Sequence, residues 1–347
     1  MEQLTVSVII PTYNRAHLIE RALNSVFGQV QSGDEIIVVD DDSVDNTRAV
    51  LERYRDRIRY VKISNGGAGR ARNRGIAEAR SDLVAFLDSD DEWMPGKLAL
   101  QRQLMGARPD ILFAFSDIAI TTKRGSIIRN FLRYWHNDPR SWDEILGPGV
   151  AYSQIAPLLA GIEDFKVHSG DLYVSLAQAI YVVTSTTIVR RVEAGDALEF
   201  GEDLPMYEDW LCFGRLAKKG KAAYLDIETA WQHAHSGPRL TDADSLVMAI
   251  TRLKILERLW GLDPGYLAQH EAEYDRVVSN QYLLKARSLI SLGRCAEARE
   301  ALEDVSDAPA YVRLLARLPG WLARRLLQIR RGLRAVLWRV LGKHEPF

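Results

Sequence analysis

Apolar and polar positions alternate in a regular way along residues 1–90. Four short runs, at residues 6–10, 35–39, 58–63 and 83–87, are rich in aliphatic residues and have the length of buried strands. Between the runs apolar residues recur every three or four positions, most clearly from Ile19 to Phe27, which is the spacing of an amphipathic helix. Strands that alternate with helices predict an α/β fold with a doubly wound, mostly parallel sheet.

Polar loops follow three of these strands. Residues 11–13 read Pro-Thr-Tyr, residues 40–43 read Asp-Asp-Asp-Ser, and residues 88–92 read Asp-Ser-Asp-Asp-Glu. Right-handed crossovers place the C-terminal ends of parallel strands at one edge of a sheet, and open α/β sheets bind their ligands at that edge. We therefore expect the three loops to meet in one crevice.

The loop at residues 88–92 carries four carboxylates in five positions. Such a cluster repels itself unless a cation lies between the oxygens, and Mg²⁺ or Mn²⁺ bound to a phosphate is the usual cation. The alternative is a turn that caps a helix starting near Lys97, because Pro95 and Gly96 come directly before it. The helix predicted after residues 66–69 begins with the basic residues Arg70 and Arg72. A nucleotide whose diphosphate is bridged to the protein by a metal accounts for two acidic loops beside this basic helix start.

On this interpretation Asp41 accepts a hydrogen bond from a base N–H, Tyr13 stacks on the base, and Arg70 or Arg72 faces the base or the phosphates. A dinucleotide-binding loop is the weaker interpretation, because residues 66–69 lack the G-x-G-x-x-G spacing after the first strand. The sequence also lacks a P-loop.

Residues 111–245 are predicted to form the second half of the same domain. Strands are predicted at 111–115, 118–121, 181–189 and 222–227, with a hairpin turn at 123–126. Residues 130–175 are rich in Trp, Tyr and Pro. A segment of this length is typical of a lid or binding loop, and its aromatic residues are predicted to pack in the core rather than on a sugar.

Glu208 and Asp209 open a predicted helix. Carboxylates stabilise helix N-termini through the macrodipole, and the alternative is that one of them is a general base for an acceptor hydroxyl. His233 and His235 follow the strand at 222–227, and a neutral imidazole is a better ligand for Mn²⁺ than for Mg²⁺. Arg239 either neutralises a leaving diphosphate or is solvated.

The C-terminal third is predicted to be helical, at residues 246–260, 274–292 and 296–302. The last two resemble one tetratricopeptide-type hairpin, which cannot form a solenoid alone and so packs on the first domain or mediates assembly. Residues 311–347 contain nine Lys or Arg and one acid, interleaved with leucines and tryptophans. This basic amphipathic pattern is typical of a membrane surface, and docking on an acidic domain is the alternative.

Composition sets broad limits. Of 347 residues 47% are apolar and 26% are charged, as in an ordinary globular protein, and the net charge of −1 gives no indication of a nucleic-acid partner. Cys212 and Cys295 lie in apolar helical contexts and are predicted to be buried thiols in a reducing compartment. The N-terminus lacks signal-peptide features and no apolar run reaches 18 residues. We expect a cytoplasmic protein, peripheral at the inner face of the membrane.

Four motifs, at residues 6–15, 37–47, 71–75 and 86–91, resemble those of family 2 glycosyltransferases with the GT-A fold, in the same order and spacing. The resemblance covers roughly residues 5–240. It implies that Asp41 binds a uracil-type base and that Asp88 and Asp90 form a D-x-D pair. Asp90 would then hold the metal on the diphosphate, with Asp88 near the ribose or sugar. The chain departs from the family at Asp42, where Gly is frequent, and this leaves open which aspartate meets the base.

The resemblance also places Asp209 at the base position of an E-D motif and His235 in an H-x-G-x-x-L-[ST] segment, where the histidine reaches the metal or the diphosphate. The full prediction has catalytic residues Asp209 and Glu208, metal ligands Asp90, Asp88 and His235, and nucleotide-binding residues Pro11, Thr12, Tyr13, Arg15, Asp41, Arg70, Arg72, Asp88 and Ser89. The predicted domains are a catalytic domain at 1–245 (nucleotide-sugar binding at about 1–110, acceptor half at 111–245), a helical extension at 246–310 and a basic tail at 311–347.

The function that follows is an inverting, metal-dependent glycosyltransferase. It would move a sugar from a nucleotide diphosphate donor, a UDP-sugar, to a hydroxyl of a saccharide or lipid-linked acceptor in polysaccharide or glycolipid synthesis. One alternative is a nucleotide-binding scaffold without turnover, against which the intact Asp88, Asp90 and Asp209 argue. A nucleotidyltransferase of the same fold is the other, and it would release pyrophosphate.

Overall fold

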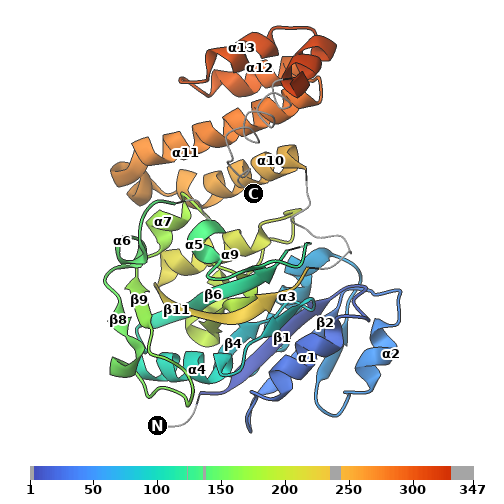
Figure 1. Cartoon of the computed structure of the whole chain (residues 1–347), viewed down its shortest axis with the longest axis vertical. Coiled ribbons are helices and arrows are strands. Elements are labelled where there is room, and N and C mark those ends of the chain that lie inside the picture. Colours follow the sequence, from blue (N-terminus) through green and yellow to red (C-terminus); the bar gives the residue numbers. More distant parts are fainter. Residues whose placement is uncertain (1–3, 123, 136–137, 235–243, 330–347) are drawn as a thin grey trace. The chain divides into compact units, whose positions relative to one another are not determined.

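A large sheet is the frame of the first of two compact units into which the chain divides, Met1–Gly237 and Pro238–Phe347. The computed structural model describes residues 4–122, 124–135, 138–234 and 244–329. Its strands are β1 (Val6–Thr12), β2 (Glu35–Asp40), β3 (Arg59–Lys62), β4 (Leu83–Phe86), β5 (Asp91–Trp93), β6 (Ile111–Thr121), β7 (Ile127–Ile128), β8 (Val150–Ala151), β9 (Lys166–Gly170), β10 (Ile188–Arg190) and β11 (Lys221–Gln232). The order across the sheet is β3, β2, β1, β4, β10, β6, β11, β9, β8, with β5 on β11 and β7 on β6. Strands β2, β1 and β4 lie side by side in Figure 1.

The N-terminal half of this sheet is parallel. β1 pairs in parallel with β2 and β4, and β2 pairs in parallel with β3. β10 runs antiparallel to both β4 and β6, and so joins this half to a second parallel pair, β6 and β11. The predicted α/β class and doubly wound, mostly parallel sheet are confirmed.

Helices cover both faces of the parallel half. The helices of the unit are α1 (Ile19–Phe27), α2 (Thr47–Glu52), α3 (Gly67–Glu78), α4 (Lys97–Ala107), α5 (Leu132–Trp135), α6 (Trp142–Leu146), α7 (Tyr173–Leu176), α8 (Arg191–Ala194) and α9 (Glu208–Lys219). Val8 and Ile10 of β1 share one buried cluster with Val26 of α1. Ile9 points to the opposite face, where α3 packs so closely that a Cβ on Gly75 would overlap Cγ2 of Ile9.

Two predicted strands, at 111–115 and 118–121, are one continuous strand, β6. The polar residues between them stay in the ladder because the carboxylate of Asp117 is satisfied inside the fold. It accepts hydrogen bonds from the backbone N–H groups of Ile118 and Leu132 and from the hydroxyl of Tyr224. The turn predicted at 123–126 leads from β6 to β7, with Lys123 outside the described residues.

The strand predicted over 181–189 is wrong for most of its length. Residues Thr184–Thr186 form a 3₁₀ turn, and the ladder of β10 begins only at Ile188. The hydroxyls of Thr186 and Thr187 each donate a hydrogen bond to the carbonyl of Val183 at 2.9 Å. Such local bonds compete with strand pairing, so the β-branched composition of this segment is misleading.

Short elements build residues 130–175, and most large aromatic residues of the segment lie in the core. Trp142, Tyr152 and Tyr173 are buried, as predicted, and Trp142 stacks on Tyr224 with ring centroids 3.8 Å apart. Trp135, in contrast, is 44% exposed.

The described part of the second unit consists of helices (Figure 1). They are α10 (Ser245–Leu256), a π-helical turn (Glu257–Gly261), α11 (Pro264–Ser291), α12 (Cys295–Glu303), α13 (Ala310–Ala316) and a last helix over residues 320–329. α11 begins earlier than predicted because Asp263 caps it, accepting from the backbone N–H groups of Gly265 and Tyr266, and because Pro264 suits a first helical turn. The predicted helical extension is confirmed.

Gly293 and Gly320 bring the turn after α11 against the start of the last helix. A Cβ on Gly320 would overlap the carbonyl oxygen of Gly293. Cys212 and Cys295 are buried free thiols, as predicted. Among the described residues, no helix is both long and apolar enough to cross a bilayer. The finer domain division at residues 110, 245 and 310 stays a prediction.

Candidate active site

Arg72 of α3 lies at the centre of a buried set of charges. Its Nη2 atom is 2.7 Å from Oδ1 of Asp88, and its Nη1 atom is 2.7 Å from Oε1 of Glu208. Asp88 follows β4, and Glu208 is the first residue of α9. The side chain of Arg72 is only 5% exposed. One guanidinium therefore joins the acidic loop to the helix that begins with both predicted catalytic carboxylates.

Close packing makes this arrangement possible. Gly69 lies on α3 three residues before Arg72, and a Cβ there would be 3.2 Å from Cγ of Glu208. The ring of Phe200 lies 5.1 Å from Cζ of Arg72. Burial lowers the pKa of Arg72, but the charges of Asp88 and Glu208 outweigh burial and raise it, so the guanidinium stays charged.

Asp209 is the second residue of α9, and its surroundings shift its pKa toward neutral pH. Its Oδ1 accepts a hydrogen bond from the N–H of Trp210 at 2.8 Å, and the hydroxyl of Thr184 donates to Oδ2 at 3.2 Å. Burial, together with the charge of Glu208, raises the pKa of Asp209 to about 7, against the opposing effect of Arg72. A general base is most effective with a pKa near the working pH.

The turn before α9 has an unusual backbone. Tyr207 has φ of 59°, in the left-handed region that bulky residues rarely adopt. Glu208 and Asp209 follow at once and open the helix, as predicted.

Asp88 and Asp90 lie in the loop after β4 and are held from several sides. The N–H of Asp88 donates to Oγ of Ser185 at 3.1 Å. Burial raises the pKa of Asp88, Arg72 opposes this, and the charge of Asp90 adds to it. Oδ2 of Asp90 is 3.6 Å from Nη2 of Arg15. Asp90 thus contributes to the charge around Asp88, and the structure brings Arg15 to this loop.

Asp41 is bound by the loop that precedes α3. Its Oδ1 and Oδ2 accept hydrogen bonds from the N–H groups of Gly66 and Gly67, both at 2.8 Å, and Oδ2 also accepts one from Nδ2 of Asn65 at 3.2 Å. Burial raises the pKa of Asp41, although these backbone hydrogen bonds oppose the shift. The two glycines are therefore fixed to the end of β2.

The remaining predicted residues are placed as follows. Pro11, Thr12 and Ser89 are buried, while Tyr13 and Arg70 are exposed. His235 and Arg239 lie outside the described residues. His233, the other histidine after β11, has its Nε2 atom 2.8 Å from Oε2 of Glu92, a pairing that the sequence does not indicate.

Comparisons with known proteins show the family of the chain. The family model for glycosyl transferase family 2 matches residues 7–145. The uncharacterized glycosyltransferase RT0329 of Rickettsia typhi is 38% identical over 258 residues, which are 74% of this chain and 70% of that protein. The chain belongs to glycosyl transferase family 2. The resemblance noted in the sequence is thereby confirmed.

Other matches are shorter or more distant. WfgD of Escherichia coli, a UDP-Glc:α-D-GlcNAc-diphosphoundecaprenol β-1,3-glucosyltransferase, is 38% identical over 135 residues, 38% of this chain and 52% of that protein. The chain thus spans about half the length, or less, of the curated relatives with the strongest matches. The crystal structure of Staphylococcus aureus TarS 1–349 with UDP-GlcNAc has a TM-score of 0.56 and 20% identity, covering 95% of this chain and 92% of that one. This likeness shows the GT-A fold.

The backbone explains the one departure from the family's motifs. Asp42 has φ of 68°, a conformation that glycine adopts without strain and that Asp tolerates better than most residues. Its carboxylate pairs with Lys62 at 2.8 Å, whereas that of Asp40 accepts a hydrogen bond from Tyr60 at 2.7 Å. Of the three aspartates, Asp41 is the one that contacts the glycine loop.

The oxygen atoms of Asp88 and Asp90, the pair predicted as a D-x-D motif, are of the type that binds a divalent cation. Carboxylate oxygens are hard ligands, and Mg²⁺ in particular is often held by one or two carboxylates with phosphate and water completing its shell. Burial raises the pKa of Asp88, and the negative charge of Asp90 adds to this shift, so the two carboxylates repel each other and a cation bound by both would relieve the repulsion. Within the described ranges, no group of three or more His, Cys, Asp and Glu forms a complete protein-only site.

One residue of the site could not be anticipated. Ser185 accepts from the N–H of Asp88, donates to Oδ2 of Asp91 at 2.6 Å, and its carbonyl accepts from Nε1 of Trp93 at 2.8 Å. It thus fixes the acidic loop at three points. It lies within the segment predicted as a strand, where nothing in the sequence distinguishes it from its neighbours.

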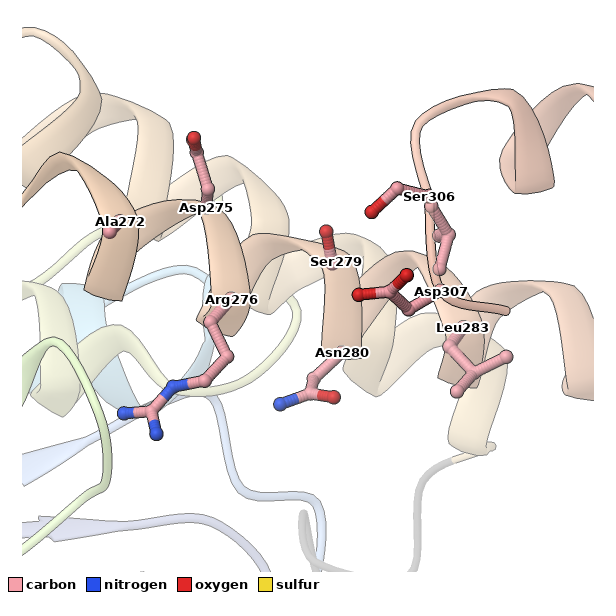
Figure 2. Close-up of a pocket in the computed structure, with 9 residues that line it drawn as sticks. Ala272, Asp275, Arg276, Ser279, Asn280, Leu283, Ser306 and Asp307 are labelled. Atoms are coloured by element: carbon pink, nitrogen blue, oxygen red, sulfur yellow. The ribbon is translucent and has the colours of Figure 1, made fainter. Parts of the chain in front are cut away.

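A separate cavity of about 290 Å³ lies in the second unit, between α11 and residues 305–307 (Figure 2). Polar side chains dominate its wall, among them Asp275, Arg276, Ser279 and Asp307. None of the predicted site residues lines this cavity.

Proposed function

We propose that this family 2 protein transfers a sugar from a nucleotide diphosphate donor to an acceptor hydroxyl, with Asp209 as the general base. The observation that carries the proposal is the double contact of Arg72 with Asp88 and Glu208. This double contact connects the loop of Asp88, which we expect to bind the donor, to Glu208, the residue directly before the proposed base.

The proposed chemistry is a single displacement. The acceptor hydroxyl gives its proton to Asp209, its oxygen bonds to the anomeric carbon, and the bond from that carbon to the diphosphate breaks. One displacement inverts the configuration at the anomeric carbon. Glu208 supports the step in two ways: it holds Arg72, and its charge helps to raise the pKa of Asp209.

Asp88 and Asp90 are the proposed ligands of a divalent cation, Mn²⁺ or Mg²⁺, on the donor diphosphate. A cation there offsets the negative charge that the leaving group acquires. Arg72 supports binding by keeping Asp88 in position. His235 is retained as a proposed ligand from the sequence.

For the donor we propose a UDP-sugar, bound by Pro11, Thr12, Tyr13, Arg15, Asp41, Arg70 and Ser89. For the acceptor we propose a saccharide, most simply a lipid-linked one, in polysaccharide or glycolipid synthesis. Two findings support this choice: WfgD is named as a UDP-glucose enzyme with a diphosphoundecaprenol acceptor, and TarS was crystallised with UDP-GlcNAc.

The test is a thermal-shift screen of UDP, GDP, CDP and dTDP, each with Mn²⁺, Mg²⁺ or EDTA. A ligand that binds only the native state raises the unfolding midpoint. We expect UDP to do so with metal and not with EDTA. Transfer is then measured with the UDP-sugars, and release of UDP rather than pyrophosphate separates a glycosyltransferase from a nucleotidyltransferase. No shift with any nucleotide would favour a scaffold.

A further inference from the structure

The last two described helices of the second unit carry a surface that is both basic and apolar. Between residues 310 and 329 the chain has four arginines and no acidic residue. Large apolar side chains are exposed among them, and Trp321, at 70%, is the most exposed. The basic-apolar surface, as we name it, consists of Arg313, Leu314, Arg317, Trp321, Arg324, Arg325, Leu326 and Ile329.

The opposite side of these helices is anchored in the unit. Val312, Leu315, Ala323 and Leu327 belong to one buried cluster with residues of α11 and α12. Gly320 starts the last helix in direct contact with Gly293. Because the buried side chains of these helices already fill the core, the exposed Trp and Leu side chains lie outside it. They are not needed to complete the unit.

Among the described residues, the arginines of this surface have no acidic partner. Arg317, Arg324 and Arg325 form no ion pair with any residue that the structure describes, whereas Arg294 of the same unit pairs with Glu297. Arg313 donates to the carbonyls of Val305 and Ser306, so its charge is also uncompensated by an acid. Within the described residues, three guanidinium groups without an acidic neighbour therefore share these helices with an exposed indole, and an anionic, partly apolar partner complements them.

We propose that the basic-apolar surface docks on a lipid bilayer with anionic headgroups. Guanidinium groups bind phosphate oxygens, and tryptophan places its ring at the boundary between headgroups and acyl chains. A helix face with Arg beside Trp and Leu lies in that boundary rather than across the bilayer. A second copy of the chain fits poorly, because it would bring the same arginines together.

Docking is tested with the full chain by sedimentation with phosphatidylcholine vesicles that contain or lack phosphatidylglycerol. We expect binding to the anionic vesicles only, and weaker binding as salt rises. Each basic residue near such a surface strengthens binding about fivefold, so R324Q/R325Q should weaken it roughly 25-fold. R324K/R325K should bind within a few-fold of the native chain, and W321A should weaken binding even at low salt.

Matched controls come from the first unit. R53Q/R55Q removes the same charge from two exposed arginines, and W135A removes another exposed indole. Neither control should change vesicle binding. Equal losses in the controls, equal binding to neutral vesicles, or no binding at all would overturn the proposal. So would a native chain that self-associates in gel filtration and becomes monomeric in R324Q/R325Q. The measurement does not involve sugar transfer, so its failure is distinct from a failure of the proposed function.

Discussion

Nη1 of Arg72 lies 2.7 Å from Oε1 of Glu208, a residue 136 positions further along the chain. The two belong to different halves of the sheet unit, and the contact is buried. Because the same guanidinium also contacts Asp88, a change at Arg72 reaches the donor loop and the start of α9 together.

Replacing Arg72 should therefore impair both stability and transfer. Arg72→Met leaves two carboxylates without their cation, and removing one partner of a buried ion pair costs about 3–5 kcal/mol. Arg72→Lys should also lose most transfer, because an ammonium group lacks the planar fork that contacts two carboxylates at once. Urea unfolding and initial rates check both statements. Arg74→Lys, at an exposed site on the same helix, is the control and should change neither.

Asp209→Asn should abolish transfer and leave nucleotide binding within a few-fold. The amide keeps the size of the carboxylate but cannot accept the proton of the acceptor hydroxyl. Product formation and the UDP thermal shift are the two readouts. Normal turnover by this variant would remove Asp209 as the base.

The rate of transfer should rise with pH through about 7. Only the ionised form of Asp209 accepts a proton, and its pKa is about 7. Below that pH the rate at saturating donor should fall about tenfold per pH unit, and above it the rate should level off. Initial rates from pH 5.5 to 8.5 check this, with the fold monitored by circular dichroism. A flat profile over that range contradicts the assignment.

The same residue predicts a pH-dependent difference in stability. The folded-state pKa of Asp209 is above its unfolded value, so folding takes up a proton between those values, and native stability falls as pH rises toward 7. Asparagine carries no such charge. Asp209→Asn should thus be stabilising relative to the native chain at pH 8 and less so at pH 5, as measured by urea unfolding. Asp196→Asn, whose side chain is fully exposed, should show no such change.

Asp90→Asn should abolish the metal-dependent part of the UDP thermal shift. The amide oxygen is a weaker ligand for a hard cation than a carboxylate, and the pair with Asp88 loses one negative charge. Asp42→Asn is the matched control, because that half-exposed carboxylate pairs with Lys62 outside the pair. A shift that persists with Mn²⁺ in Asp90→Asn and disappears with EDTA would place the cation on other ligands.

Much of the fold could be predicted because its signals are local. The runs at β1 to β4 and the helical spacing of α1 lie within single elements, and the loops that follow the strands are marked by polarity. Glu208 at the start of α9 is marked in the same way. The strand predicted over residues 181–189 was wrong at 184–187 because the hydroxyl groups of Thr186 and Thr187 bond to the nearby carbonyl of Val183, which composition does not reveal.

The contacts between residues of the site could not be predicted from the sequence, for a different reason. Nothing near Ser185 in the sequence indicates that it holds Asp88 and Asp91, more than 90 residues before it. The contact of Glu92 with His233 likewise requires β5 to lie beside β11. Such contacts depend on the order of strands in the sheet, and that order has no local signal.

Tyr207 has a consequence for how the protein inactivates. A left-handed backbone at a bulky residue costs roughly 1–2 kcal/mol and persists only where surrounding contacts impose it. This residue directly precedes the two carboxylates of α9, so their direction depends on the packing around the turn rather than on local preference. We expect this turn to relax early when heat or denaturant loosens that packing. Activity should therefore disappear at a lower temperature than the sheet, and an assay of transfer would report the early steps of unfolding that circular dichroism misses.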